Sequence, residues 1–144
     1  MHRPVLTFAL VLSTATMALS HAGVKNETVK ARMQMMSKIG AATKTLGTMA
    51  AGKTAYDQAI VDATQEELAK EADSIIAFFK ENADDPKSEA RAEIWNNFPD
   101  FEKKAEALSL AAGEVSSVRS AADLKLAMRA IGASCKGCHQ AYRE

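Results

Sequence analysis

Apolar residues recur at steps of three and four along most of the chain, and strand-like alternation of apolar and polar residues is not evident. Steps of this kind follow the 3.6-residue period of an amphipathic α-helix. Four helices are therefore expected, at about residues 26–51, 54–82, 99–116 and 120–143. The pattern contains no internal repeat and no low-complexity segment.

Each expected helix carries one apolar stripe that would face a shared core. The stripe of the first helix is expected to comprise Val29, Met33, Met36, Gly40, Thr43, Gly47 and Ala50. The stripe of the last helix is expected to comprise Leu124, Met128, Ile131, Cys135, Cys138 and Tyr142. The second stripe is expected to comprise Ile60, Thr64, Leu68, Ala72, Ile75 and Phe79. The third is expected to comprise Phe98, Phe101, Ala105, Leu108, Ala112 and Val115.

Local signals mark the ends of these helices. Gly52 is a natural residue to follow the first helix, and the spacing of Thr54 and Asp57 predicts a capping box that begins the second. Pro99 suits the first turn of the third helix. Ser120 begins a further capping-box pattern, which predicts the start of the fourth helix.

The connections between the helices predict how they are arranged. The links between the first two helices and between the last two are short, which favours antiparallel neighbours. The second helix is expected to end at Ala83-Asp84-Asp85-Pro86, and the longer link follows at about residues 87–98. This link contains the single tryptophan, Trp95, and would hold a crossing or cofactor-covering loop. We therefore expect an all-α fold, an antiparallel four-helix bundle formed by residues 23–144.

The first 22 residues have the pattern of a cleaved export signal. A short basic region precedes an uncharged apolar run over residues 5–19, and Ser20 and Ala22 supply small residues at a cleavage site. The apolar run is short for a bilayer span, so a permanent membrane anchor is the weaker alternative. We expect cleavage near Ala22, no membrane insertion afterwards, and one domain.

Charge is balanced over the whole chain, with 18 Lys and Arg against 18 Asp and Glu. Cleavage after Ala22 would remove Arg3 and leave 122 residues with a net charge near −1. This balance lacks the basic footprint of nucleic-acid binding proteins, so no nucleic-acid partner is expected. Partners would meet a mixed or mildly acidic surface.

The two cysteines of the chain, Cys135 and Cys138, lie in the segment CKGCH near its end. A disulfide between them would close almost no loop and stabilise little. The spacing C-x-x-C-H is typical of covalent haem c attachment. Thiols one helical turn apart can reach the two vinyl groups of a porphyrin, and the adjacent His139 can bind the iron. One covalent haem c on the C-terminal helix is expected.

Other uses of this segment fit less well. A structural zinc site needs about four ligands, and residues 23–144 contain no other cysteine and no other histidine. A thioredoxin-type dithiol would accompany a βαβ unit, which the pattern lacks. A four-helix interaction protein without haem is the remaining alternative. Haem c attachment follows export, so the export signal and the motif together indicate the periplasm.

The position of the motif constrains a second iron ligand. Only five residues follow His139, so such a ligand must come from upstream. Met128 shares the helix of His139, which makes it an unsuitable ligand for the opposite face. The methionines after the expected signal are Met33, Met35, Met36, Met49 and Met128.

Four segments resemble the class II cytochromes c, the family of cytochrome c′ and its low-spin, methionine-ligated relatives. The first helix has an arginine, then Met36 four residues later, then a glycine, and a Gly-Lys turn precedes Ala55-Tyr56-Asp57. Glu93-Ile94-Trp95 precedes a helix with Phe98 and Phe101, and CKGCH is followed by Tyr142-Arg143. The resemblance covers essentially all of residues 23–144 and implies a four-helix bundle.

The resemblance also implies roles for individual residues. Met36 would bind the iron through sulfur and give a six-coordinate, low-spin haem, and Arg32 would meet a propionate. Arg143 would lie beside the proximal imidazole, and Trp95 would pack on or near the haem. The plainer alternatives are that Met36 fills the core or the distal wall and that Arg32 is a solvated surface arginine. Arg143 would then be a frayed terminal charge, and Trp95 a core residue or loop anchor.

These features predict a periplasmic electron carrier that is not an enzyme and has axial ligands His139 and Met36. Its partners would be periplasmic redox proteins, and formation of a homodimer is left open. The alternative is a five-coordinate cytochrome c′ that binds nitric oxide or another small gas.

Overall fold

The computed structural model describes residues 23–144, and the predicted export signal, residues 1–22, lies outside the described residues. The described chain forms the following elements in order: α1 (Glu27–Ala50), α2 (Gln58–Phe79), the short α3 (Glu93–Asn96), α4 (Phe98–Glu114), the 3₁₀ turn η1 (Val115–Ser117) and α5 (Ala121–Tyr142). No helix in this part of the chain is long and apolar enough to cross a membrane.

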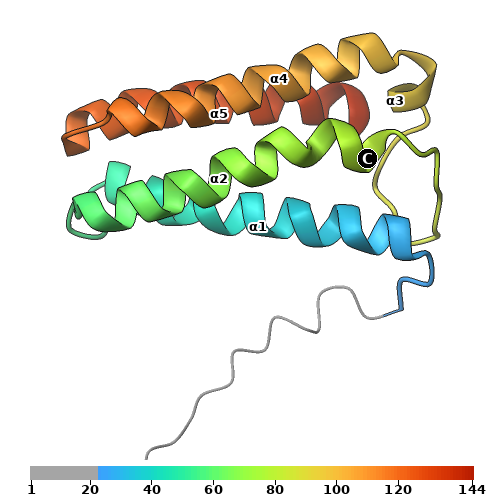
Figure 1. Ribbon diagram of the computed structural model, residues 1–144, viewed down its shortest axis with the longest axis horizontal. Helices are drawn as coiled ribbons and strands as arrows, with labels where there is room; N and C mark the ends of the chain where they lie inside the picture. Colours follow the sequence, from blue (N-terminus) through green and yellow to red (C-terminus); the bar gives the residue numbers. More distant parts are fainter. Residues whose placement is uncertain (1–22) are drawn as a thin grey trace, which may run out of the picture.

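The four long helices form an antiparallel bundle, as the sequence predicts (Figure 1). Adjacent pairs around the bundle are α1 and α2, α2 and α4, α4 and α5, and α5 and α1. Helix α2 is therefore diagonally opposite α5. The first and last helices of the chain are direct neighbours, and they run antiparallel to each other.

Polar side chains cap the helices at their first turns. The Asn26 side chain accepts a hydrogen bond from the Val29 amide at the start of α1, at 3.1 Å. At the start of α5, the Ser120 hydroxyl oxygen accepts one from the Asp123 amide at 3.1 Å, as the predicted capping box requires. Gly52 follows α1 with a φ of +69°, a conformation that glycine adopts at little cost.

The prediction for the start of α2 was wrong by three residues, counted from the expected N-cap to the observed one. Asp57, expected within the first turn, is itself the N-cap, and its carboxylate accepts from the Ile60 amide at 3.1 Å. Thr54 lies instead in the turn after α1, where its hydroxyl contacts that of Thr48 at 3.4 Å. Aspartate is a better N-cap than the β-branched threonine, so the helix starts after Asp57 and not after Thr54.

The most buried face of α1 lies one residue away from the expected stripe. The buried residues of α1 are Val29, Arg32, Met35, Ile39, Ala42, Leu46 and Met49. Most of the expected stripe, including Met33, Met36 and Thr43, is half-buried on the adjacent face. Helix α1 therefore has two neighbouring apolar stripes. One of them packs in the core and the other borders a cavity.

Other expected stripes fit more closely. On α4 the buried residues match the prediction, except that Phe98 is only half-buried. On α5, Leu124, Ile131 and Tyr142 are buried, whereas the two cysteines are half-buried. The prediction of Ile60 as a core residue was wrong, because Val61 is fully buried and Ile60 is 45% exposed.

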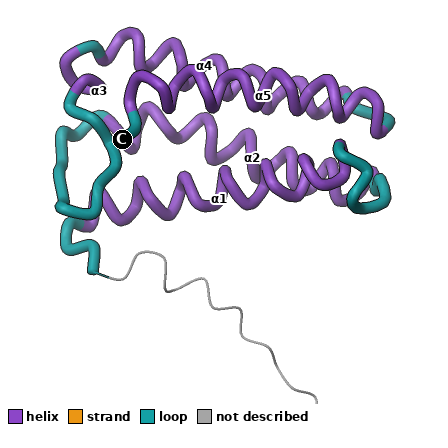
Figure 2. Tube along the Cα trace, turned by 180° about the vertical axis from the view of Figure 1, so that it is seen from behind, coloured by secondary structure: helices purple, strands orange, loops and turns teal. Residues whose placement is uncertain are grey.

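The link between α2 and α4 closes one end of the bundle, beside the C-terminal end of α5 (Figure 2). Ala90 and Arg143 form an isolated antiparallel bridge. The Asp85 carboxylate accepts hydrogen bonds from the amides of Lys25, Asn26 and Lys87, at 2.8, 3.0 and 2.9 Å. These hydrogen bonds favour the ionised form and hold the Asp85 pKa below its usual value. Asp85 thus fastens the start of α1 to the link.

A candidate haem pocket

A cavity of about 510 Å³ lies at the end of the bundle that the link between α2 and α4 covers. This volume is within the range of small-molecule and cofactor sites. Its walls are largely apolar and come from α1, α2, α4, α5 and the link between α2 and α4. The exposed residues among them lie on α1, α5 and the link: Ser37, Gly40, Glu89, His139 and Arg143. The mouth of the cavity is therefore at the seam between α1 and α5.

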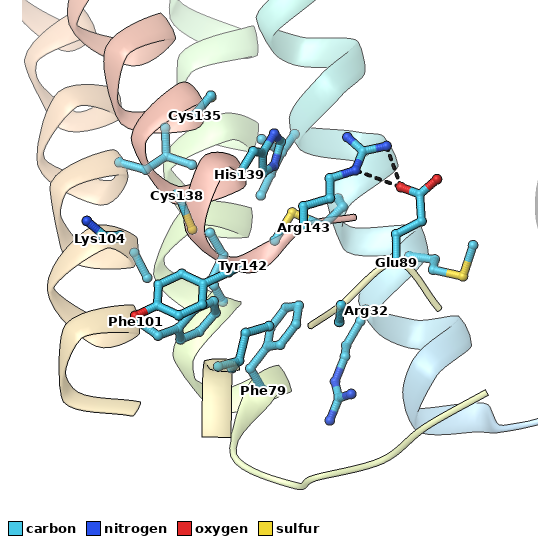
Figure 3. Close-up of a pocket in the computed structure, with 18 of the residues that line it drawn as sticks. Arg32, Phe79, Glu89, Phe101, Lys104, Cys135, Cys138, His139, Tyr142 and Arg143 are labelled. Atoms are coloured by element: carbon cyan, nitrogen blue, oxygen red, sulfur yellow. Dashed lines mark hydrogen bonds and ion pairs between the residues drawn. The ribbon is translucent and has the colours of Figure 1, made fainter. Parts of the chain in front are cut away.

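Helix α5 brings Cys135, Cys138 and His139 to this cavity (Figure 3). Both thiols are free and half-buried. Burial raises the pKa of Cys135 and of Cys138, so both remain protonated thiols at neutral pH. Burial first, and the positive charge of Arg143 second, lower the pKa of His139. A neutral imidazole is the form that binds a metal.

The register of α1 and α5 follows from one close approach. A Cβ atom added to Gly47 would lie 3.9 Å from Met128 Cε. Met36 precedes Gly47 by eleven residues, and His139 follows Met128 by eleven. Eleven residues are about three helical turns, so both shifts return to the same helix faces. Because the two helices are antiparallel, Met36 comes to the level of His139, and both line the cavity.

Arg143 and Glu89 form an ion pair at the cavity mouth (Figure 3). The two guanidinium contacts to Glu89 Oε2 measure 2.5 and 2.6 Å, from Nη2 and Nε respectively. Main-chain hydrogen bonds hold the two segments together, with the Arg91 amide donating to the Tyr142 carbonyl at 3.0 Å. The sequence alone gives no sign of Glu89, because this pair joins segments 54 residues apart.

Arg32 lines the cavity, but its guanidinium has a structural role that the sequence interpretation missed. It is 3% exposed and donates to the main-chain carbonyls of Phe78, Ala83 and Glu81, the first two at 2.8 and 2.9 Å. Burial lowers its pKa. The alternative of a solvated surface arginine was wrong. The propionate contact stays a prediction.

We expect Arg32→Met to lower the free energy of unfolding by about 3 kcal/mol, because it leaves the Phe78 carbonyl, in the last turn of α2, and the buried Ala83 carbonyl, just after that helix, without their donor. Urea unfolding of the haem-loaded protein measures this change. The matched control is Lys44→Met, which removes an exposed cation from the same helix and is expected to change stability little. Equal stability of the two variants would contradict the structural role.

Trp95 does not line the cavity, whereas its neighbour Ile94 does. The Trp95 indole N–H donates to the Phe79 carbonyl at 2.9 Å, and the centroid of the Trp95 ring lies 5.1 Å from the Arg32 guanidinium carbon. These contacts correspond to the loop anchor, the plainer of the two alternatives. The structure thus provides no support for direct packing of Trp95 on a haem.

Several lining residues were not identified as site residues from the sequence. Phe101 packs edge-to-face against Tyr142, with ring centroids 5.5 Å apart, and Lys104 lines the same wall. The Tyr142 hydroxyl donates to Asp100 at 2.6 Å, which raises the Tyr142 pKa to about 12. Phe101 and Tyr142 were placed on core stripes, and a core position cannot be told from a cavity wall by periodicity.

The cavity fits a haem in size and in the chemistry of its lining. Two thiols one turn apart and an imidazole face a space with largely apolar walls. Thr43 also lines this space, and among the described residues its Oγ1 is a buried side-chain atom without a hydrogen-bond partner. Such unpartnered atoms are rare in complete sites. No group of three or more His, Cys, Asp or Glu that could hold a metal ion occurs within residues 23–144.

Comparison with known proteins gives a family match over nearly the whole described chain. The family model described as Cytochrome C′ matches residues 27–143. A curated relative, cytochrome c-556 of Agrobacterium tumefaciens (strain apple 185), is 37% identical over 116 residues, which are 78% of this chain and 91% of the relative.

Solved structures are similar in fold as well. Cytochrome c prime from Shewanella frigidimarina matches with a TM-score of 0.75 and 26% identity, over 82% of this chain and 94% of that one. A leucine-to-isoleucine mutant of cytochrome c prime from Alcaligenes xylosoxidans, in complex with nitric oxide, also gives a TM-score of 0.75, with 27% identity and the same coverage.

Proposed function

Since the chain belongs to the cytochrome c′ family, whose members carry covalent haem c and are typically periplasmic, we propose that it is a periplasmic electron carrier with one haem. Cys135 and Cys138 would hold the haem through thioether bonds, and His139 would be an axial ligand. When bound, the haem supplies one-electron redox chemistry. The chain itself needs no catalytic group, so we propose no enzymatic activity.

Met36 is proposed as the second axial ligand. The observation that carries this proposal is the register of α1 and α5, which brings Met36 to the level of His139 beside the same cavity. A thioether opposite an imidazole raises the reduction potential and favours a low-spin iron. The neighbouring Met33 also lines the cavity, but it lies nearly one turn nearer the start of α1.

Gas binding is the second candidate function. One similar structure is a nitric oxide complex of a cytochrome c prime variant. In this chain, Gly40 lines the cavity one turn after Met36, and a Cβ atom there would meet nothing within 4 Å. This open space beside Met36 could admit a diatomic molecule if the thioether did not bind the iron.

The optical spectrum of the haem-loaded protein tests the proposal. We expect a low-spin ferric spectrum with a methionine-to-iron charge-transfer band, and little carbon monoxide binding by the ferrous form. A high-spin ferric spectrum with ready carbon monoxide binding would instead support the gas-binding function.

A further inference from the structure

Charge is unevenly distributed among the helices although the chain as a whole is balanced. Helix α5 and its C-cap carry Lys125, Arg129, Lys136 and Arg143, and no acidic residue lies between Leu124 and Arg143. Helix α2 carries one lysine and five acidic residues: Asp62, Glu66, Glu67, Glu71 and Asp73. Because α2 is diagonally opposite α5, the described bundle has an acidic side and a basic side.

The four cations of α5, here named the basic stripe, share one face of the helix. Their steps of four, seven and seven residues keep them within about 40° of one another around the helix axis. All four are exposed. Within the described chain, Lys125, Arg129 and Lys136 form no ion pair, whereas Arg143 is paired with Glu89.

The basic stripe borders the cavity mouth. Met128 and His139 lie between the stripe and the buried side of α5, on the flank that faces α1. Helix α1 also contributes no acidic side chain at this seam, because Glu27 is its only one and lies at its first residue. Glu89, already paired with Arg143, is the only carboxylate among the residues that line the cavity.

We propose that the basic stripe and the seam beside it form the docking surface for an acidic protein that exchanges electrons with this chain. This inference rests on the proposed electron-carrier function. Charge complementarity is the argument for such a partner, because unpaired cations beside the redox site attract and orient an acidic surface. The acidic side formed by α2 would repel the same partner, so the two sides together align the approach.

The ionic-strength dependence of electron exchange by the ferrous holoprotein tests this inference. In stopped-flow experiments the haem iron loses one electron to ferricyanide, an anion that becomes ferrocyanide, or to tris(phenanthroline)cobalt(III), a cation that becomes the cobalt(II) complex. We expect the ferricyanide rate to fall and the cobalt rate to rise as salt is added. For an acidic protein probe, flavodoxin semiquinone passes one electron to the ferric holoprotein and becomes oxidised flavodoxin, and this rate should also fall as salt is added.

Charge reversal locates the surface. We expect Arg129→Glu with Lys136→Glu to slow the reaction with ferricyanide and with flavodoxin by about three- to tenfold at low salt, and to speed the cobalt reaction. The matched control, Lys70→Glu with Lys80→Glu, makes the same charge change on α2 and its C-cap and should alter these rates little. Should Lys136→Glu impair haem attachment, Lys125→Glu with Arg129→Glu serves as the test pair.

Each other outcome has a definite meaning. Equal effects of the α5 and α2 pairs, with a low-spin spectrum retained, would overturn the docking surface but leave the electron-carrier function standing. A high-spin, carbon monoxide-binding wild type would instead overturn the function itself. Loss of binding to phosphatidylglycerol vesicles in the α5 variants, with unchanged electron-exchange rates, would show a membrane surface in place of a protein partner.

Discussion

His139→Ala is expected to reduce the haem content of the purified protein at least about tenfold, because residues 23–144 contain no other histidine to bind the iron. Cys135→Ser should have a similarly severe effect, since it removes one of the only two thiols in the chain. The pyridine haemochrome assay, on protein exported by cells that express haem-maturation machinery, measures the result.

Gln140→Ala is the matched control for these variants. Gln140 is exposed, follows His139 directly, and does not line the cavity. We expect it to retain normal haem content. Normal haem content in His139→Ala or Cys135→Ser would contradict the assignment of the CKGCH segment and revive the interpretation as a haem-free bundle.

Met36→Leu is expected to convert a low-spin ferric haem to a high-spin one. Leucine is close to methionine in volume but has no sulfur, so the fold should tolerate the change while the axial bond is lost. The charge-transfer band should disappear, the reduction potential should fall, and carbon monoxide should bind the ferrous protein stoichiometrically.

Two other methionines of α1 provide controls for this change. Met33→Leu alters the same cavity wall, and Met35→Leu alters the buried core, where Met35 is 2% exposed. Both variants should keep the low-spin spectrum of the wild type. Loss of the band in Met33→Leu and not in Met36→Leu would transfer the proposed ligand to Met33.

The helices, their order and the haem-attachment segment could be predicted from the sequence because each depends on local information. Periodicity predicts amphipathic helices, and short links predict antiparallel neighbours. The side of α1 that packs in the core could not be predicted in the same way. Two apolar stripes adjoin there, one through Met35 and one through Met36, and only the arrangement of the other helices decides which is the more buried.

The contacts that join distant segments were also beyond sequence reasoning. Arg32 was expected to be a haem-side cation, yet its donors meet carbonyls about 50 residues further along the chain. The four-residue spacing of Arg32 and Met36 agrees with the finding that both line the cavity. This spacing carried no information about the carbonyls at and after the end of α2, which accept hydrogen bonds from the Arg32 guanidinium.

The pairing of α1 with α5 has a consequence for the order in which the protein assembles. The α1 wall and the α5 wall of the cavity come from opposite ends of the described chain, with Met36 and His139 separated by about a hundred residues, so loop closure between them is slow and costly in entropy. Helices α4 and α5 are close in sequence and can pair early. We therefore expect the thiols of α5 to be available for covalent attachment before α1 docks, and the distal wall to form last.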